Sequence, residues 1–545
     1  MRRVLSTVVL SAMLMGFWGP PAQADVKLPA LFSNGMVLQS GDTTPIWGTA
    51  DPGEQVSVVL NLQNGDALRP ESVRADSQGR WKLILAEEVA PPRRLLRRFR
   101  RWETVGLEPG GPYSLTVSGK NQITLNDVYI GEVWICSGQS NMEWPLRMTT
   151  GAEQTIQQAK NPLLRLFTAT KATADQPLDD VKGTWRECSS ESARNFSAVA
   201  YFFGRDLQKT LNVPVGLIHT SWGGTRAEAW TRHEVLESQS EWKDEFPRYE
   251  QAKADYPKAI EKYRQEQEKR KSADSSKEKG QKSPANARAP QDPARNPNSP
   301  SVLYNAMIAP IIPYGIRGAI WYQGESNAGA AFLYRKLFPL MIQNWRNDWR
   351  RGDFPFLFVQ LAPWQAIVKE PQESAWAELR EAQLLTTQNL RHAGMAVITD
   401  VGDPKDIHPR NKEPVGARLA LIARARTYGQ PVEYAGPIYD SMDVTDNTAV
   451  LHFTHVGKGL ETHSGPLTGF TIAGEDQKFH NAEAEIRDNM VHVWNKDVPR
   501  PVAVRYGWAN CPVVNLWNKD GLPASPFRTD DFPKVTKPKS VTKAN

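Results

Sequence analysis

A serine at position 140 has the sequence environment of a catalytic hydroxyl group. Ser140 lies in SGQSN (137–141), directly after the apolar run VWIC (133–136) that predicts a buried strand. A hydroxyl nucleophile needs a base near its proton and hydrogen-bond donors around the oxyanion that develops on the substrate. Taken alone, a serine at this place is more typical of a helix N-cap. The rest of the chain therefore has to supply the base and the donors.

Three later segments also place polar residues directly after an apolar, strand-like run. They are WGGTRAEAW (222–230), with Gly223 and Gly224; QGESNA (323–328); and VGDPKDIHPRNK (401–412), in which His408 follows Asp403 and Asp406. Glycines let the backbone approach a ligand, amides can donate hydrogen bonds, and an imidazole can accept a proton near neutral pH. Each segment alone is typical of a loop. Because open α/β sheets bind ligands at the carboxyl ends of their strands, the four segments together predict a hydrolytic site.

The region that brings these segments together is predicted at residues 126–431. Apolar runs such as VGLIHTS, GAIWY, FLFVQL and GMAVITD alternate there with helical patterns such as AVAYFFGRDLQKTL and YRKLFPLMIQNWRNDW. This alternation is typical of an α/β fold, with a parallel sheet flanked by helices on both faces. We therefore expect a catalytic domain at 126–431.

Short alternating strands broken by turn residues lie on both sides of this domain. Residues 25–125 contain QVSVVLNL, WKLILA and YSLTVSG, and residues 432–535 contain AVLHFTHVG, LTGFTIAGE and PVAVRYGWA. Such patterns predict N-terminal and C-terminal antiparallel β-sandwich regions. Residues 536–545 are expected to be a flexible tail.

Three segments depart from these patterns. Residues 1–24 combine two arginines, an apolar stretch and a cleavage motif ending at Ala24, which predicts a cleaved signal peptide and a secreted or periplasmic protein. The basic insertion PPRRLLRRFRRW (91–102) is expected to be a solvated loop, with contact to an acidic polysaccharide or a membrane surface as the alternative. The insertion at 241–300 begins as a charged helix, and we expect its Pro-, Ser- and Lys-rich second half to be disordered.

The charge and spacing of residues exclude several classes of protein. No stretch after the signal approaches the roughly 18 apolar residues of a membrane span. The formal net charge of +6 comes from local basic runs and does not indicate nucleic-acid binding. No cysteine or histidine spacing resembles a zinc site, and SGQSN does not match the G-x-S-x-G of α/β-hydrolases. We therefore expect no nucleic-acid partner, no transmembrane span, no metal and no cofactor.

Nine motifs occur together along the chain. They are GEVWICSGQSNMEWP, WGGTRAEAW, LYNAMIAPII, GAIWYQGESN and DIHPRNK in the central region, and LPALFSNGMVLQ, GFTIAGEDQKF, VAVRYGWA and GLPASPFRTDD nearer the ends. In this combination the sequence resembles the sialate O-acetylesterases, a branch of the SGNH (GDSL-like) hydrolases. The resemblance covers nearly the whole mature chain except the insertions at 91–102 and 241–300. It implies an SGNH-like sheet and a serine esterase acting on an acetylated carbohydrate.

The resemblance also implies roles for individual residues. Ser140 would be the nucleophile and His408 the general base. The oxyanion donors would be the backbone N–H of Ser140, a backbone N–H of Gly223 or Gly224, and a side-chain amide. The usual amide block is Gly-x-Asn, whereas this chain has QGESN, so we assign the amide to Gln323 with Asn327 as the alternative.

The acid of the triad has three candidates. The superfamily places it three residues before the histidine, where this chain has Lys405. An acid on the histidine Nδ1 fixes the tautomer and stabilises the imidazolium. Asp406 is our first choice and Asp403 our second, and a Ser–His dyad that uses a backbone carbonyl is the third alternative.

Other residues near these motifs could contact the substrate or support the site. Glu325 could pair with Arg226, which is also a candidate for binding a sialate carboxylate. Trp144, Trp222 and Trp321 could stack on sugar rings, although ordinary core packing is at least as common for such residues.

Two alternative functions follow from the same sequence. A secreted, non-catalytic carbohydrate-binding protein would explain the β regions and the aromatic residues, but it would not require Ser140 with His408. Among enzymes, the acetyl group is inferred more firmly than the alcohol, so an acetylxylan-type esterase is the alternative to a sialate esterase.

Overall fold

The computed structural model describes residues 25–41, 44–62, 65–68, 70–85, 87–89, 103–274 and 288–538. Four predicted features lie wholly or partly outside these ranges. They are the signal at 1–24, the basic insertion at 91–102, residues 275–287 of the second insertion, and residues 539–545 of the tail.

Seven strands of an 11-stranded sheet form the centre of the molecule, in the order β11-β10-β12-β9-β13-β14-β15. Their bounds are β9 Gln122–Gly138, β10 Asn161–Thr168, β11 Trp185–Cys188, β12 Val215–His219, β13 Gly318–Tyr322, β14 Phe356–Val359 and β15 Ala393–Ala396. All neighbours pair in parallel except β10 and β11. The carboxyl ends of β9, β12, β13, β14 and β15 therefore meet at one edge, as the sequence predicts.

Helices cover both faces of this sheet because successive strand side chains point to opposite sides. In β9, Trp134 and Cys136 pack in a core that includes α4 and α9, whereas Val133 and Ile135 pack in the core that includes α7 and α8. The helices are α1 Ser140–Glu143, α2 Ala152–Gln157, α3 Ser190–Arg194, α4 Ala198–Leu211, α5 His233–Glu237, α6 Glu245–Asp274, α7 Ala331–Trp349, α8 Ala375–Asn389 and α9 Glu413–Arg426. The predicted α/β class is confirmed.

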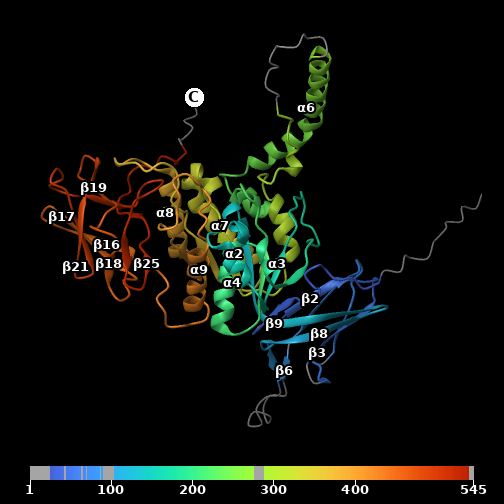
Figure 1. Cartoon of the computed structure of the whole chain (residues 1–545). Helices are drawn as coiled ribbons and strands as arrows, with labels where there is room; N and C mark the ends of the chain where they lie inside the picture. Colours follow the sequence, from blue (N-terminus) through green and yellow to red (C-terminus); the bar gives the residue numbers. More distant parts are fainter. Residues whose placement is uncertain are drawn as a thin grey trace, which may run out of the picture.

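Part of the N-terminal region joins the same sheet through β9 (Figure 1), whereas β2 pairs with β5 and β6 pairs with β7 in separate two-stranded sheets. The first part of β9 pairs with β8 and the middle with β1, and β3 and β4 continue from β8. The bounds are β1 Val37–Gln39, β2 Thr44–Thr49, β3 Gln55–Asn61, β4 Glu71–Arg74, β5 Arg80–Leu85, β6 Glu87–Val89, β7 Glu103–Val105 and β8 Gly110–Ser118. The expected border between residues 125 and 126 therefore lies inside one continuous strand.

The C-terminal strands form three separate antiparallel sheets on the opposite side of the central sheet from the N-terminal strands (Figure 1). Their orders are β16-β17-β22-β21, β20-β19-β23-β26 and β18-β24-β25. The bounds are β16 Ile438–Thr445, β17 Thr448–Thr454, β18 Leu460–Thr462, β19 Phe470–Ala473, β20 Phe479–Asn481, β21 Glu483–Arg487, β22 Met490–Trp494, β23 Ala503–Tyr506, β24 Leu516–Asn518, β25 Leu522–Pro523 and β26 Phe527–Arg528.

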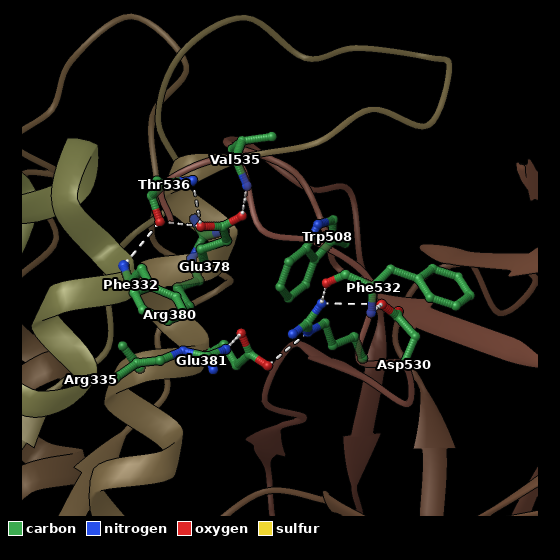
Figure 2. Close-up of polar contacts among 12 residues, drawn as sticks. Phe332, Arg335, Glu378, Arg380, Glu381, Trp508, Asp530, Phe532, Val535 and Thr536 are labelled. Atoms are coloured by element: carbon green, nitrogen blue, oxygen red, sulfur yellow. Dashed lines mark hydrogen bonds and ion pairs between the residues drawn. The ribbon is translucent and has the colours of Figure 1, made fainter. Parts of the chain in front are cut away.

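Two carboxylates on α8 attach this region to the catalytic region (Figure 2). Glu378 accepts the backbone N–H groups of Val535 at 2.7 Å and Thr536 at 3.1 Å. Glu381 accepts from Arg335 of α7 and, at 2.8 Å, from the buried Arg528 of β26. The start of the segment that was expected to be a flexible tail is thus held by hydrogen bonds.

The insertion at 241–300 is more ordered than its composition suggests. Its first half forms α6, which projects away from the sheet (Figure 1). Residues 288–300 contain a short 3-10 helix, Pro293–Arg295, and Ser299 is buried and donates to the Pro293 carbonyl at 2.8 Å. The expectation of disorder is therefore wrong for 288–300, because side-chain hydrogen bonds that composition does not reveal fix this segment.

Candidate active site

Ser140 lies just beyond the carboxyl end of β9, as the first residue of α1. The chain turns at Gly138, where φ is 133° and a Cβ would collide with the Tyr322 carbonyl oxygen, so the turn needs glycine. Gln139, and not Ser140, occupies the N-cap position, and no side chain caps the helix. The Ser140 hydroxyl is therefore not used in capping, and its Oγ lies 2.9 Å from His408 Nε2.

The His408 ring is held from two sides. It stacks on the Trp144 ring, with centroids 5.1 Å apart and planes 19° apart. Asp406 Oδ1 accepts the His408 backbone N–H at 2.9 Å and lies 3.5 Å from Nδ1. Burial lowers the pKa of His408, and the positive charge of Lys412 lowers it further, while Asp406 opposes both effects. The ring is thus oriented with Nδ1 toward a carboxylate and Nε2 toward the serine, as a general base requires.

The alternative acid, Asp403, has a different partner. Its Oδ1 accepts the backbone N–H of Lys405 at 2.8 Å, a bond that stabilises the local turn. Among the described residues, Asp406 is the carboxylate that contacts His408.

Residues 222–230, called the glycine segment, follow β12 and lie against Ser140. A Cβ on Gly223 would lie 3.2 Å from Ser140 Cβ, so the main chain passes close to the hydroxyl. The Gly223 N–H donates to Glu143 Oε2 at 2.7 Å, and Glu143 Oε1 accepts from Lys171 at 2.5 Å. Within the described part of the chain, the N–H groups of Ser140 and Gly224 donate to no other group. The N–H group of Gly223, in contrast, is occupied by Glu143.

Gln323, predicted as the amide donor, uses its Nε2 in hydrogen bonds to other protein groups. It is fully buried, and its Nε2 donates to Asn327 Oδ1 at 2.6 Å and to the Thr225 carbonyl at 3.2 Å. Asn327 Nδ2 in turn donates to Glu228 Oε2 at 2.9 Å. Assigning the oxyanion amide to Gln323, or to Asn327, therefore does not fit this geometry. Both amides instead support the chain beneath the glycine segment.

The predicted pairing of Glu325 with Arg226 is also absent from the site. Arg226 Nη2 contacts Glu228 at 2.5 Å and Glu245 at 3.2 Å, so this arginine pairs with two other carboxylates. Glu325 Oε1 instead accepts from Asn141 Nδ2 at 2.5 Å. Glu325 thus ties the loop after β13 to the turn that carries Ser140.

The three candidate tryptophans have different environments. Trp144 stacks on His408, and Trp222 is partly exposed with Lys171 Nζ 5.4 Å from its ring centroid. Trp321 is fully buried and packs edge to face against Trp230. Trp321 therefore belongs to the core, and Trp222 is the tryptophan of the three with an exposed face beside the glycine segment.

The sequence analysis missed four polar residues around the site. Asn141 and Lys412 form a buried hydrogen bond behind the serine, and Glu143 occupies the Gly223 N–H. Asn298 donates to the Gly224 carbonyl at 3.0 Å and accepts the Arg226 backbone N–H at 2.9 Å, so it fixes the glycine segment. Asn141 directly follows Ser140, and Lys412 lies four residues after His408. These positions in the motifs were the available sign that the two residues support the site.

The described ranges contain neither a metal-ligand cluster nor a membrane-spanning helix. No group of three or more His, Cys, Asp or Glu side chains is arranged there to hold a metal ion. None of the helices in those ranges is both long and apolar enough to cross a membrane.

Comparisons with known proteins agree with the fold and the position of the motifs. The family model described as carbohydrate esterase, sialic acid-specific acetylesterase, matches residues 130–283 and 295–413. Sialate O-acetylesterase from Pongo abelii is 29% identical over 79% of this chain and 76% of its own length, and that from Mus musculus is 28% identical over 92% and 94%. The structure of a carbohydrate acetylesterase from Xanthomonas citri superimposes with a TM-score of 0.75 and 35% identity, over 93% of this chain and 100% of the other.

Proposed function

The chain belongs to the carbohydrate esterase family of sialic acid-specific acetylesterases, and we propose that it removes O-acetyl groups from sialic acid or a related acetylated sugar through an acetyl-serine intermediate. The family makes it a carboxylic ester hydrolase. The observation that carries the mechanism is the 2.9 Å contact of Ser140 Oγ with His408 Nε2. A non-catalytic carbohydrate-binding protein would not require this pair, which disfavours that alternative.

In the first half of the reaction, His408 Nε2 takes the proton of Ser140 as Oγ attacks the acetyl carbonyl carbon. Asp406 lies on the opposite ring nitrogen and stabilises the imidazolium that forms. The Ser140 and Gly224 N–H groups bind the oxyanion, and Gly223 adds a third donor if the substrate displaces Glu143. When the tetrahedral intermediate collapses, His408 gives its proton to the sugar oxygen, which leaves as the alcohol.

In the second half, His408 removes a proton from a water molecule that attacks the acetyl-serine. The same N–H groups bind the second oxyanion, and Oγ leaves with the proton from His408, so that acetate is released and the starting state returns. Trp144 and Trp222 frame the site and are suited to contact with a sugar ring.

The alcohol part of the substrate has two candidates, because two kinds of relative bear different names. The mammalian relatives are named for sialate esters, whereas the more similar solved structure is named as a carbohydrate acetylesterase. An esterase of an acetylated polysaccharide is therefore the second candidate.

The test is acetate release from a chromogenic acetate ester, O-acetylated sialic acid and acetylated xylan, by wild type and Ser140→Ala. We expect release that depends on Ser140, with kcat/KM highest for the sialate ester. Faster release from xylan would assign the second candidate, and release that persists in Ser140→Ala would contradict the mechanism.

We further propose that the protein is exported and cleaved after Ala24. The arginines, apolar stretch and cleavage motif of residues 1–24 support this. Amino-terminal sequencing of the protein recovered outside the cytoplasm should begin at Asp25, and an uncleaved, retained chain would contradict the proposal.

A further inference from the structure

A buried polar cluster lies behind the Ser140–His408 pair and has no part in the steps above. It consists of Asn141 in α1, Glu325 after β13, and Lys412 at the residue preceding α9. Asn141 is 1% exposed and Lys412 is 0% exposed. Burying an ammonium group costs free energy unless hydrogen bonds and opposite charge compensate it, so Lys412 is an unusual choice for this position.

Asn141 connects the two chain segments that carry the proposed catalytic side chains. Its Nδ2 donates to the Ile407 carbonyl at 3.1 Å, and its Oδ1 accepts from Lys412 Nζ at 2.5 Å. Asn141 directly follows Ser140, and Ile407 directly precedes His408. One amide therefore sets the distance between the two segments, and Lys412 fixes the orientation of that amide, because only the oxygen can accept from an ammonium group.

Two aromatic rings and a carboxyl group offset part of the cost of burying the Lys412 charge. Its Nζ lies 5.3 Å from the Tyr322 ring centroid and 5.9 Å from that of Trp144, the ring on which His408 stacks. Glu325 reaches the same cluster through Asn141, and its second oxygen is buried without a partner. The cluster thus joins a cation, an amide and a carboxyl group.

The charges around His408 come from both sides of its ring. Burial lowers the pKa of Lys412 to about 7, and Glu325 and Asp406 oppose that shift. Burial also raises the pKa of Glu325. At His408, burial and the Lys412 charge lower the pKa while Asp406 raises it, and Ser140 and Trp144 are the uncharged neighbours.

We propose that Lys412 is a positioning residue of the esterase: it fixes Asn141 so that Ser140 and His408 keep their separation, and its charge keeps the imidazole unprotonated under mildly acidic conditions. The inference rests on the proposed function, because it assigns Lys412 a role in the same reaction. It gives a reason for a buried lysine where a neutral side chain could fill the space.

The test compares Lys412→Met with Lys405→Met, which removes the same charge from an exposed position in the segment before His408. A general base must be unprotonated, so activity falls as the pH drops through the His408 pKa. Removing the Lys412 charge raises that pKa, and the acid limb of kcat/KM should move up by about 0.5–1 pH unit. We expect kcat to fall about tenfold or more with KM within about twofold, and Lys405→Met to change neither quantity appreciably.

A second variant, Glu325→Gln, keeps an acceptor for Asn141 and removes the carboxyl group. Lys412 then loses its proton more readily, so the acid limb should move in the same direction by a smaller amount, even if Lys412→Met fails to fold. An unmoved limb in the folded variants, whatever the fall in kcat, would overturn the inference while the reaction still depends on Ser140. Loss of the Ser140 dependence itself would instead overturn the proposed function.

Discussion

Two pairs of polar side chains lie at the same edge of the central sheet and have opposite environments. Ser140 and His408 face each other at 2.9 Å and are partly exposed, whereas Gln323 and Asn327 are buried and bond to each other at 2.6 Å. Ser140, Gln323 and Asn327 lie just after buried strands, whereas His408 lies in the connection between β15 and α9. The position of a segment therefore shows which residues gather at the edge, but not whether their polar atoms face the substrate or the core.

The largest expected effect is on the exposed pair. His408→Ala should lower kcat/KM by at least about 10³-fold, because the serine loses its general base. The free energy of unfolding should change by less than about 1 kcal/mol, since the ring is partly exposed. Steady-state kinetics with a chromogenic ester and urea unfolding measure the two quantities. A variant with near-normal turnover would remove His408 from the mechanism.

The next effect distinguishes the two acids beside the histidine. Asp406→Asn should lower kcat/KM about 10- to 100-fold, because the imidazolium loses its carboxylate, while the partly exposed site retains solvent stabilisation. Asp403→Asn serves as the matched control and should change kcat/KM by less than about threefold, since within the described residues Asp403 bonds to the turn at Lys405 and not to His408. Equal effects, or the reverse ranking, would reassign the acid.

The buried pair should respond in stability before it responds in catalysis. Gln323→Ala should reduce the free energy of unfolding by about 1–3 kcal/mol, because the Thr225 carbonyl and the Asn327 amide lose a buried partner. Gln372→Ala, at an exposed position, should be neutral. Denaturant unfolding measures both. A stable Gln323→Ala protein with a 10²-fold or larger loss of kcat would restore Gln323 as an oxyanion donor.

The smallest expected effect concerns Asn298, whose side chain supports the glycine segment. Asn298→Ala removes two hydrogen bonds to the chain around Gly224 and should cost about 0.5–1.5 kcal/mol of stability, with a modest rise in KM. The exposed Asn447→Ala is the control. Stability and KM both equal to wild type would show that the glycine segment does not depend on residues 288–300.

The sequence predicts the sheet and the gathering of the four segments because both depend on local patterns: apolar runs, helical periodicity and glycine turns. It does not predict the orientation of Gln323, which depends on Thr225 and Tyr334 in other elements. The order of residues 288–300 is missed for a similar reason. It depends on hydrogen bonds of single residues, such as those of Asn298, which the overall composition does not reveal. The sequence pattern also does not show that one strand, β9, runs through the proposed border at 125/126.

The most direct test of the proposed mechanism is to trap its covalent intermediate. The wild-type enzyme is mixed with a chromogenic acetate ester and quenched in acid within the first turnover, and the peptides are analysed by mass spectrometry. The mechanism predicts one acetyl group on Ser140, and no such adduct in His408→Ala over the same time. Acetate release without any acetyl-Ser140, or an acetyl group on another residue that turns over at the catalytic rate, would contradict it.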